Sequence, residues 1–204
     1  MVTDSRGLVS APVSHTVVAG NSAPTVTISG APSSARYAVG QSITLTASAN
    51  DAEDGPLPIT WTIVRVHGSH THPWLGPVTG PSVTTTYPAP EDLAATTISW
   101  LKVTASARDS AGVTTRITRR LLPHLVTLQL ASVPTGARLS VNDVSFTAPA
   151  DVVSWASWVV HLAAADQTIG GQAYAFRSWS DGGAAAHDVT TPAVDTTYTA
   201  TFSG

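Results

Sequence analysis

Three histidines within six residues are the side chains of this sequence best suited to chemistry. His67, His70 and His72 follow the segment 59–66, in which apolar and polar residues alternate as in a β-strand. His70 and His72 are two apart, so in a strand they share a face, and His67 approaches them from the preceding turn. Three imidazoles could hold Zn²⁺ or Cu²⁺ with one open coordination position. The alternative is three solvated or hydrogen-bonded loop histidines, and no base or nucleophile stands beside them for metal-assisted catalysis.

Four carboxylates form a second candidate metal site, for Ca²⁺. Asp51, Glu53 and Asp54 occupy one turn, and Asp109 begins another. In an immunoglobulin-like sandwich these two turns lie at the same end, which would bring the carboxylates together. Ca²⁺ takes about six to eight oxygen ligands, and backbone carbonyls could supply the remainder. The alternative is that Asp51 and Asp109 accept Asx-type hydrogen bonds in their turns and that the other two are solvated.

Four tryptophans are candidates for carbohydrate binding, because an exposed indole offers a flat apolar face to a sugar ring. They are Trp74, Trp100, Trp155 and Trp158. Trp100 alternates out of phase with the apolar residues of the segment 97–108, so it faces away from the first core, alongside Lys102. The alternative is that Trp100, Trp155 and Trp158 pack between two domains or subunits. Trp61 and Trp179 are expected in cores.

Composition favours many short strands over helices. The chain has 204 residues, of which 43% are hydrophobic and only 11% charged, and proline and glycine recur at short intervals. The net charge is −3 and no basic cluster is large enough for a nucleic-acid backbone. There is no cysteine, which excludes disulfides and thiolate chemistry. No apolar run is long enough for a membrane span, and the N-terminal residues do not resemble a signal peptide.

No sequence motif indicates an active site. Ser180 and Asp181 lie in Ser-Trp-Ser-Asp-Gly-Gly, which lacks the Gly-x-Ser-x-Gly pattern of a nucleophile elbow and indicates a tight turn. A phosphate-binding loop and a dinucleotide fingerprint are also absent from the sequence. We therefore expect a protein that is not an enzyme by itself.

The pattern predicts an all-β protein of two tandem β-sandwiches. Strands are expected near 8–18, 21–28, 40–50, 59–66, 82–87, 97–108, 113–122, 126–130, 137–141, 152–164, 174–179 and 197–202. About seven of them fall within roughly 100 residues before Pro123, as in an immunoglobulin-like domain. The predicted organisation is an N-terminal strand or linker (1–21), an immunoglobulin-like sandwich (22–123) and a smaller sandwich (124–204).

Several segments resemble a known kind of module. They are Ala23-Pro-Thr-Val, the run 46–55, His70-Thr-His, Ala107-Arg-Asp-Ser-Ala-Gly, Pro134-Thr-Gly, the run 174–183 and Thr197-Tyr-Thr-Ala-Thr-Phe. The chain is similar over residues 22–203 to the polycystic-kidney-disease-type (PKD-like) region at the C-terminus of actinobacterial PQQ-dependent glucose/sorbosone-type sugar dehydrogenases. In those relatives the histidine-rich segment often carries a cysteine pair, which is absent here.

The resemblance implies a secreted or cell-surface accessory module whose export signal is not in this chain. Such a module would bind polysaccharide or a cell-surface glycan on behalf of an attached sugar-oxidising enzyme domain, and PQQ would belong to that absent domain. Two other functions remain open. One is a structural or assembly protein without a ligand, such as a spacer or a self-associating surface or phage subunit. The other is a small metal-binding protein that uses His67, His70 and His72.

Overall fold

The computed structural model describes residues 2–11 and 20–204, and over these residues the chain forms strands, turns and loops but no helix. The strands before His124 are β1 (Thr25–Ser29), β2 (Arg36–Tyr37), β3 (Ser42–Asp51), β4 (Gly55–Pro56), β5 (Thr60–His67), β6 (His70–Thr79), β7 (Ser82–Thr86), β8 (Ser99–Arg108) and β9 (Thr114–Pro123). Those after it are β10 (Leu125–Val133), β11 (Arg138–Val141), β12 (Val144–Thr147), β13 (Ala150–Trp155), β14 (Val159–Ala163), β15 (Gln167–Ile169), β16 (Gln172–Trp179), β17 (Ala186–Thr190) and β18 (Thr196–Ser203). The predicted all-β class is confirmed.

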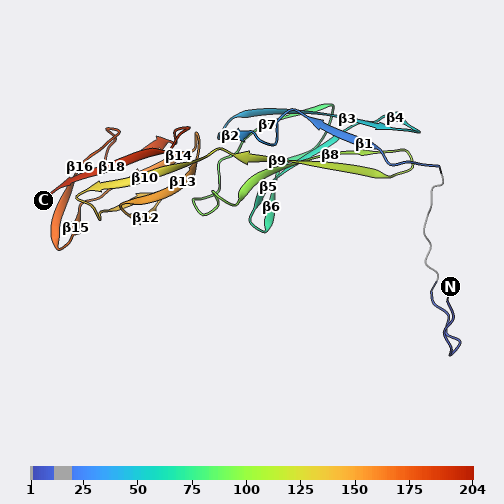
Figure 1. The fold of residues 1–204 in the computed structure, drawn as a ribbon, viewed down its shortest axis with the longest axis horizontal. Coiled ribbons are helices and arrows are strands. Elements are labelled where there is room, and N and C mark those ends of the chain that lie inside the picture. Colours follow the sequence, from blue (N-terminus) through green and yellow to red (C-terminus); the bar gives the residue numbers. More distant parts are fainter. Residues whose placement is uncertain (1, 12–19) are drawn as a thin grey trace.

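These strands form four sheets. In one, β3 pairs with β1, β4 and β7, and a second has the order β2-β9-β8-β5-β6. The third has the order β13-β10-β18-β16-β15 and the fourth β12-β11-β14-β17. Most neighbours are antiparallel, but β2 pairs with β9 and β10 pairs with β18 in parallel. Every strand pair in the described residues joins partners from the same side of His124, and Figure 1 shows the two pairs of sheets end to end.

Buried and exposed residues alternate along the strands of the second sheet, and this alternation turns one face of the sheet toward the core. Along β8 each second residue is buried, so Leu101 and Val103 point inward while Lys102 and Thr104 point outward. Trp61, on the neighbouring strand β5, is fully buried, and its Nε1 donates a hydrogen bond of 2.8 Å to the carbonyl oxygen of Gly80. This bond satisfies the one polar atom of the indole, as a buried tryptophan requires.

The second half differs from the sequence prediction at residues 152–164. One continuous strand is expected there, but the structure has two, β13 and β14, which lie in different sheets. Ser157 adopts a positive φ of 65° between them, and Trp158 N donates to the carbonyl of Trp155 across this turn. The segment is apolar because both strands are largely buried, and a continuous apolar run does not reveal a turn.

The segment after the histidines is also a strand rather than a loop. Trp74 lies within β6, the edge strand of its sheet, where Pro73 and Pro77 interrupt no inner ladder. These prolines hide the strand from a sequence pattern. The short strands β2, β4, β12, β15 and β17 were not expected either. Of the predicted strand 8–18, residues 12–18 lie outside the described part, and residues 2–11 contain one isolated bridge between Thr3 and Val9.

Trp155 lies where the two halves meet. Its side chain is 1% exposed, its ring lies 5.6 Å from that of Tyr87, and its Nε1 donates a 2.8 Å hydrogen bond to the carbonyl of Thr96. Backbone bonds of 2.9 Å add to this contact: Val39 N donates to the carbonyl of Ala156, whose own N donates to the carbonyl of His124. One buried apolar cluster therefore runs through both halves of the chain.

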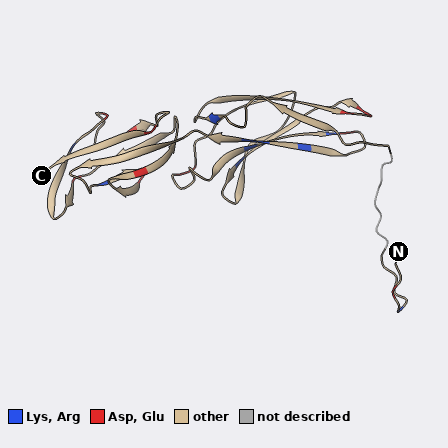
Figure 2. Cartoon of the chain, viewed as in Figure 1, with Lys and Arg blue, Asp and Glu red and all other residues tan. Residues whose placement is uncertain are grey.

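Charge is sparse over the whole molecule. Figure 2 shows Lys and Arg and Asp and Glu as scattered positions on both halves, with the acidic turn between β3 and β4 at the end of its sheet. In the part of the chain that the structure describes, no helix is long and apolar enough to cross a membrane.

Candidate functional site

The three predicted histidines meet on a β-hairpin. β5 and β6 are joined by Gly68 and Ser69, and Gly68 has a φ of +54°, which glycine adopts without steric cost. His67 stands directly opposite His70, and His72 is two residues further along β6. The ring centroids lie 4.9 Å apart for His67 and His70 and 4.8 Å apart for His70 and His72. One ligating nitrogen of each ring lies within 4.8 Å of the others.

This cluster is the one group of three or more potential metal ligands found among residues 2–11 and 20–204. His70 and His72 are exposed and His67 is half-buried. An ion could therefore reach the imidazoles from solvent. His70 and His72 lie two apart in β6, as the sequence indicated, whereas His67 is the last residue of β5 and not part of the turn.

Glu91 is a fourth member that the sequence prediction missed. It lies in the loop between β7 and β8, and its Oε2 accepts a 2.7 Å hydrogen bond from His67 Nδ1. Its Oε1 is 3.2 Å from Arg65 Nη1 and 3.5 Å from His72 Nε2. The hydrogen bond from His67 is the main reason why the pKa of Glu91 lies below its usual value. Nothing in the spacing of the sequence joins position 91 to the hairpin, because the contact is made by a loop that folds back.

Further polar groups lie beside the histidines on β5 and β8. Arg65 stands opposite His72 in the hairpin, and Ser99 stands opposite His67 across β5 and β8. Arg65 Nε and Ser99 Oγ are both buried without a hydrogen-bond partner in the protein. Buried polar atoms of this kind are uncommon in folded proteins. This end of the sheet is thus polar, whereas Ile63 and Leu101 just beyond it are fully buried and apolar.

Trp74 and Trp100 lie at the surface of the same sheet. Trp74 is 38% exposed; its Nε1 donates a 2.9 Å hydrogen bond to Thr85 Oγ1, and Arg65 Cζ lies 5.5 Å from its ring. Trp100 faces outward beside Lys102 as expected, but the guanidinium of Arg120 covers its ring at 4.3 Å. Such a cation–π contact uses the ring face that a sugar would need.

Trp155 and Trp158 are inside the protein. They are 1% and 9% exposed, and both belong to the buried apolar cluster. A buried ring presents no face to a sugar, so we retain neither as a carbohydrate-binding residue. The sequence also allowed these tryptophans to pack between two domains, and Trp155 does lie between the two halves of the chain. Trp61 and Trp179 are in the core, as expected.

The four carboxylates do lie at one end of the fold, where Asp54 Oδ2 accepts a 2.7 Å hydrogen bond from Ser110 N. Donors from the chain occupy most of their oxygens, however. Asp51 Oδ1 accepts from the backbone N–H groups of Glu53 and Asp54, and Glu53 Oε2 accepts from Ser22. Asp51 Oδ2 is buried without a partner. Within the described ranges no three of these carboxylates converge closely enough to share an ion.

Asp109 is tied to two other segments. Its Oδ2 accepts from Asn21 Nδ2 at 2.9 Å and its Oδ1 accepts from Val113 N at 2.6 Å. The hydrogen bond from Asn21 is the largest cause of a lowered pKa for Asp109. Asp109 therefore acts in the Asx-type manner that the sequence offered as the alternative to calcium binding.

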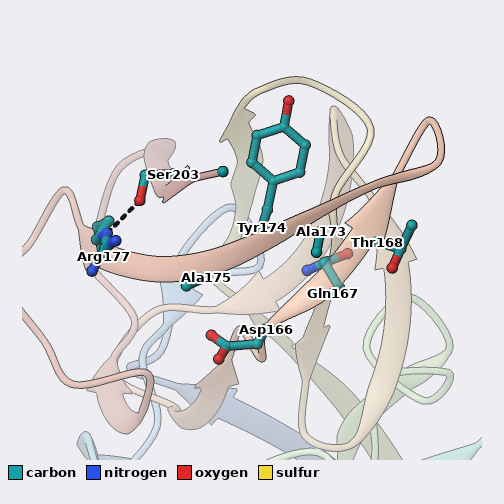
Figure 3. Close-up of a pocket in the computed structure, with 9 residues that line it drawn as sticks. Asp166, Gln167, Thr168, Ala173, Tyr174, Ala175, Arg177 and Ser203 are labelled. Atoms are coloured by element: carbon teal, nitrogen blue, oxygen red, sulfur yellow. Dashed lines mark hydrogen bonds between the residues drawn. The ribbon is translucent and has the colours of Figure 1, made fainter.

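A surface depression in the second half of the chain has no catalytic arrangement. It has a volume of about 480 Å³ and is lined by β15, β16 and the C-terminal residues. Figure 3 shows Tyr174 rising from one side and Asp166 lying below, with Arg177 donating a hydrogen bond to Ser203 at the other side. Asp166 Oδ1 accepts from Phe176 N at 2.8 Å. The polar groups therefore stabilise the strand ends and do not converge on one point.

Comparison with known protein families, curated proteins and solved structures finds no match for this chain. The resemblance to the PKD-like regions of sugar dehydrogenases therefore stays a prediction.

The lowered pKa of Asp109 predicts a loss of stability in acid. Its ionised form is favoured in the folded protein, so its contribution is complete above the ordinary pKa of 3.8 and is lost as the pH falls through the lower folded value. We expect Asp109→Asn to lower the urea midpoint at about pH 7, and this difference from the unaltered protein to shrink toward about pH 3. Asp143→Asn, at an exposed position in the turn between β11 and β12, is the control. A difference that is constant over this pH range would contradict the assignment.

Calcium binding at the acidic turns is testable by thermal unfolding. Because donors of the chain occupy most carboxylate oxygens, we expect millimolar Ca²⁺ to leave the melting temperature unchanged. A ligand that binds only the folded state must raise it, by about 2.7 kcal/mol of stability at a concentration of 100 Kd. A rise that a chelator reverses, and that Asp54→Asn abolishes, would instead establish the calcium site.

Proposed function

We propose that this chain is a non-catalytic accessory module that acts as a rigid spacer. It consists of two tandem sandwiches, an immunoglobulin-like one over residues 22–123 and a smaller one over residues 124–204. Two observations support the division: no strand pair of the described residues crosses His124, and this single residue separates β9 from β10. A one-residue connection restricts the orientations that the two sandwiches can adopt.

The contact of Trp155 with Tyr87 and Thr96 carries this proposal. The indole belongs to β13, whereas the two residues that it contacts precede β8, so the contact joins the two sandwiches. Buried aromatic rings contribute more to association than most other side chains. The hydrogen bond to Thr96 fixes the direction of the ring as well as its position. A buried aromatic contact between the two sandwiches, which we call the seam, maintains their end-to-end arrangement. Domains that touch only through small polar surfaces move relative to one another.

The shape fits a spacer. In Figure 1 the two pairs of sheets lie end to end along the longest axis, with the C-terminus at one end and the acidic turn between β3 and β4 toward the other. An attached domain would thereby be held at a set distance from its neighbour. The resemblance to modules of secreted sugar dehydrogenases supplies the class of partner, a sugar-oxidising enzyme domain outside the cell, with the cell surface or a polysaccharide as the other attachment.

Removing the indole at the seam tests the spacer. We expect the unaltered protein to unfold in one transition and to scatter X-rays as a single elongated body. Trp155→Ala should cost about 3–5 kcal/mol of stability, as for other buried tryptophans, and should separate the unfolding of the two sandwiches. Its distribution of interatomic distances should also broaden, because the orientation of the sandwiches is no longer fixed.

Trp179→Ala is the matched control for this experiment. Trp179 is 3% exposed and packs against Phe176 within the second sandwich, so its loss should destabilise that half without broadening the scattering distribution. The spacer proposal is wrong if Trp155→Ala scatters like the unaltered protein, or if the unaltered protein already unfolds in two independent transitions.

Carbohydrate binding is a second candidate, and the exposed ring of Trp74 favours it. This indole lies beside Arg65 and two exposed histidines, so an apolar face and hydrogen-bond donors occur together. We expect Trp74→Ala to reduce retention of the chain on insoluble polysaccharide or cell walls at least about tenfold if it makes the main contact. Trp100→Ala should have the smaller effect, because Arg120 already covers that ring.

Val78→Ala is the matched control for retention, since Val78 is a 41% exposed apolar residue of the same strand. Absence of retention on every polymer, or equal retention of the Trp74 and Val78 variants, would remove carbohydrate binding at this surface and leave the spacer proposal intact.

A further inference from the structure

The geometry points to a transition-metal site on the β5–β6 hairpin, in which His67, His70 and His72 bind one Cu²⁺ or Zn²⁺ ion and Glu91 positions His67. This site goes beyond the spacer proposed above and does not depend on it.

The hairpin brings the three imidazoles close together. The closing pair of a hairpin places two side chains directly opposite each other, and His67 and His70 form this pair. His72 shares the face of His70, so the third ring extends the same row. Zn²⁺ or Cu²⁺ held at about 2.0–2.1 Å by each nitrogen requires neighbouring nitrogens about 3.3 Å apart in a tetrahedral arrangement. The present separations, up to 4.8 Å, are brought to that value by rotation of side chains that are mostly exposed.

The carboxylate of Glu91 lies against the ring of His67. A histidine that binds a metal through one nitrogen usually donates the other ring N–H to a carboxylate, which fixes the tautomer and the ring orientation. Glu91 Oε2 makes this contact with His67 Nδ1 at 2.7 Å. The lone pair of His67 then resides on Nε2. Arg65, whose Nη1 lies 3.2 Å from Oε1, holds the other oxygen of the same carboxylate and restricts its movement.

Contacts between histidine and carboxylate also occur elsewhere in this protein. Two other histidines also contact carboxylates: His161 Nδ1 lies 2.8 Å from Asp188 and His187 Nε2 lies 3.0 Å from Asp181. Neither belongs to a group of three potential ligands among the described residues. A histidine–carboxylate pair is therefore an ordinary feature of this surface, and the three adjacent imidazoles are what distinguish the hairpin.

The donor set selects the class of metal. Three neutral imidazoles favour Cu²⁺ and Zn²⁺ over Mg²⁺ and Ca²⁺, which prefer oxygen ligands. Exposure of His70 and His72 leaves room for water or an external ligand to complete the coordination. Cu²⁺ is expected to bind more tightly than Zn²⁺, since affinity for nitrogen ligands generally peaks at copper in this series.

Titration of the full chain with Cu²⁺ and, separately, with Zn²⁺ tests the site by calorimetry. We expect one ion per chain, with affinity at least about tenfold lower for the double variant His70→Ala, His72→Ala. His161→Ala is the matched control and should bind as the unaltered protein does. Glu91→Gln should weaken binding by about 10–100-fold, the range found when a partner behind a metal-binding histidine is changed.

Two further readouts distinguish the site from nonspecific binding. The electron paramagnetic resonance spectrum of bound Cu²⁺ should show coupling to imidazole nitrogens, and this signal should be lost in the double variant. Bound Cu²⁺ should also quench tryptophan fluorescence less in Trp74→Phe, because the Trp74 ring lies 5.5 Å from Cζ of Arg65, which stands opposite His72. Equal affinity of the double variant and the unaltered protein, or no stoichiometric binding of either metal, would overturn the proposal.

Discussion

An indole buried between two sets of sheets is the interaction on which the arrangement of this molecule depends. Trp155 belongs to the second half, but its ring contacts Tyr87 and its N–H is bonded to the carbonyl of Thr96 in the first half. Burying this ring without a partner for its N–H would leave a polar group unpaired in the interior, at a cost of about 1–3 kcal/mol. The hydrogen bond removes that cost and gives the contact a direction. The spacer that we propose follows from this one contact.

The hairpin of β5 and β6 combines two environments on one pair of strands. At one end Trp61 and Ile63 belong to the apolar core, whereas at the other end the inward row continues with Arg65 and His67, which Glu91 covers. Alternation along a strand places a side chain on a face but does not determine whether that face is covered by apolar or polar groups. The loop that carries Glu91 makes the difference, since it closes this end of the sheet with a carboxylate.

The fold of this chain carries little information about its function, and the environments of single side chains carry more. Folds built from packed β-sheets support many unrelated activities. The tryptophans illustrate the point: Trp74 is exposed, the ring of Trp100 is covered by Arg120, and Trp155 and Trp158 are buried. The same residue type therefore serves as a surface group, a stacking partner and a packing element within one protein. Only the environment of each ring separates a binding residue from a structural one.

The amino-acid sequence by itself determined the all-β class and the position of most long strands, because alternation of apolar and polar residues is a local property that each strand carries. It also indicated the shared face of His70 and His72, which depends only on spacing along one strand. The turn at Ser157, the contact of Glu91 with His67 and the burial of Trp155 were decided by the tertiary structure. Each of these depends on contacts between segments far apart in the chain or on the direction in which a continuous apolar run turns, and neither property leaves a periodic signal in the sequence.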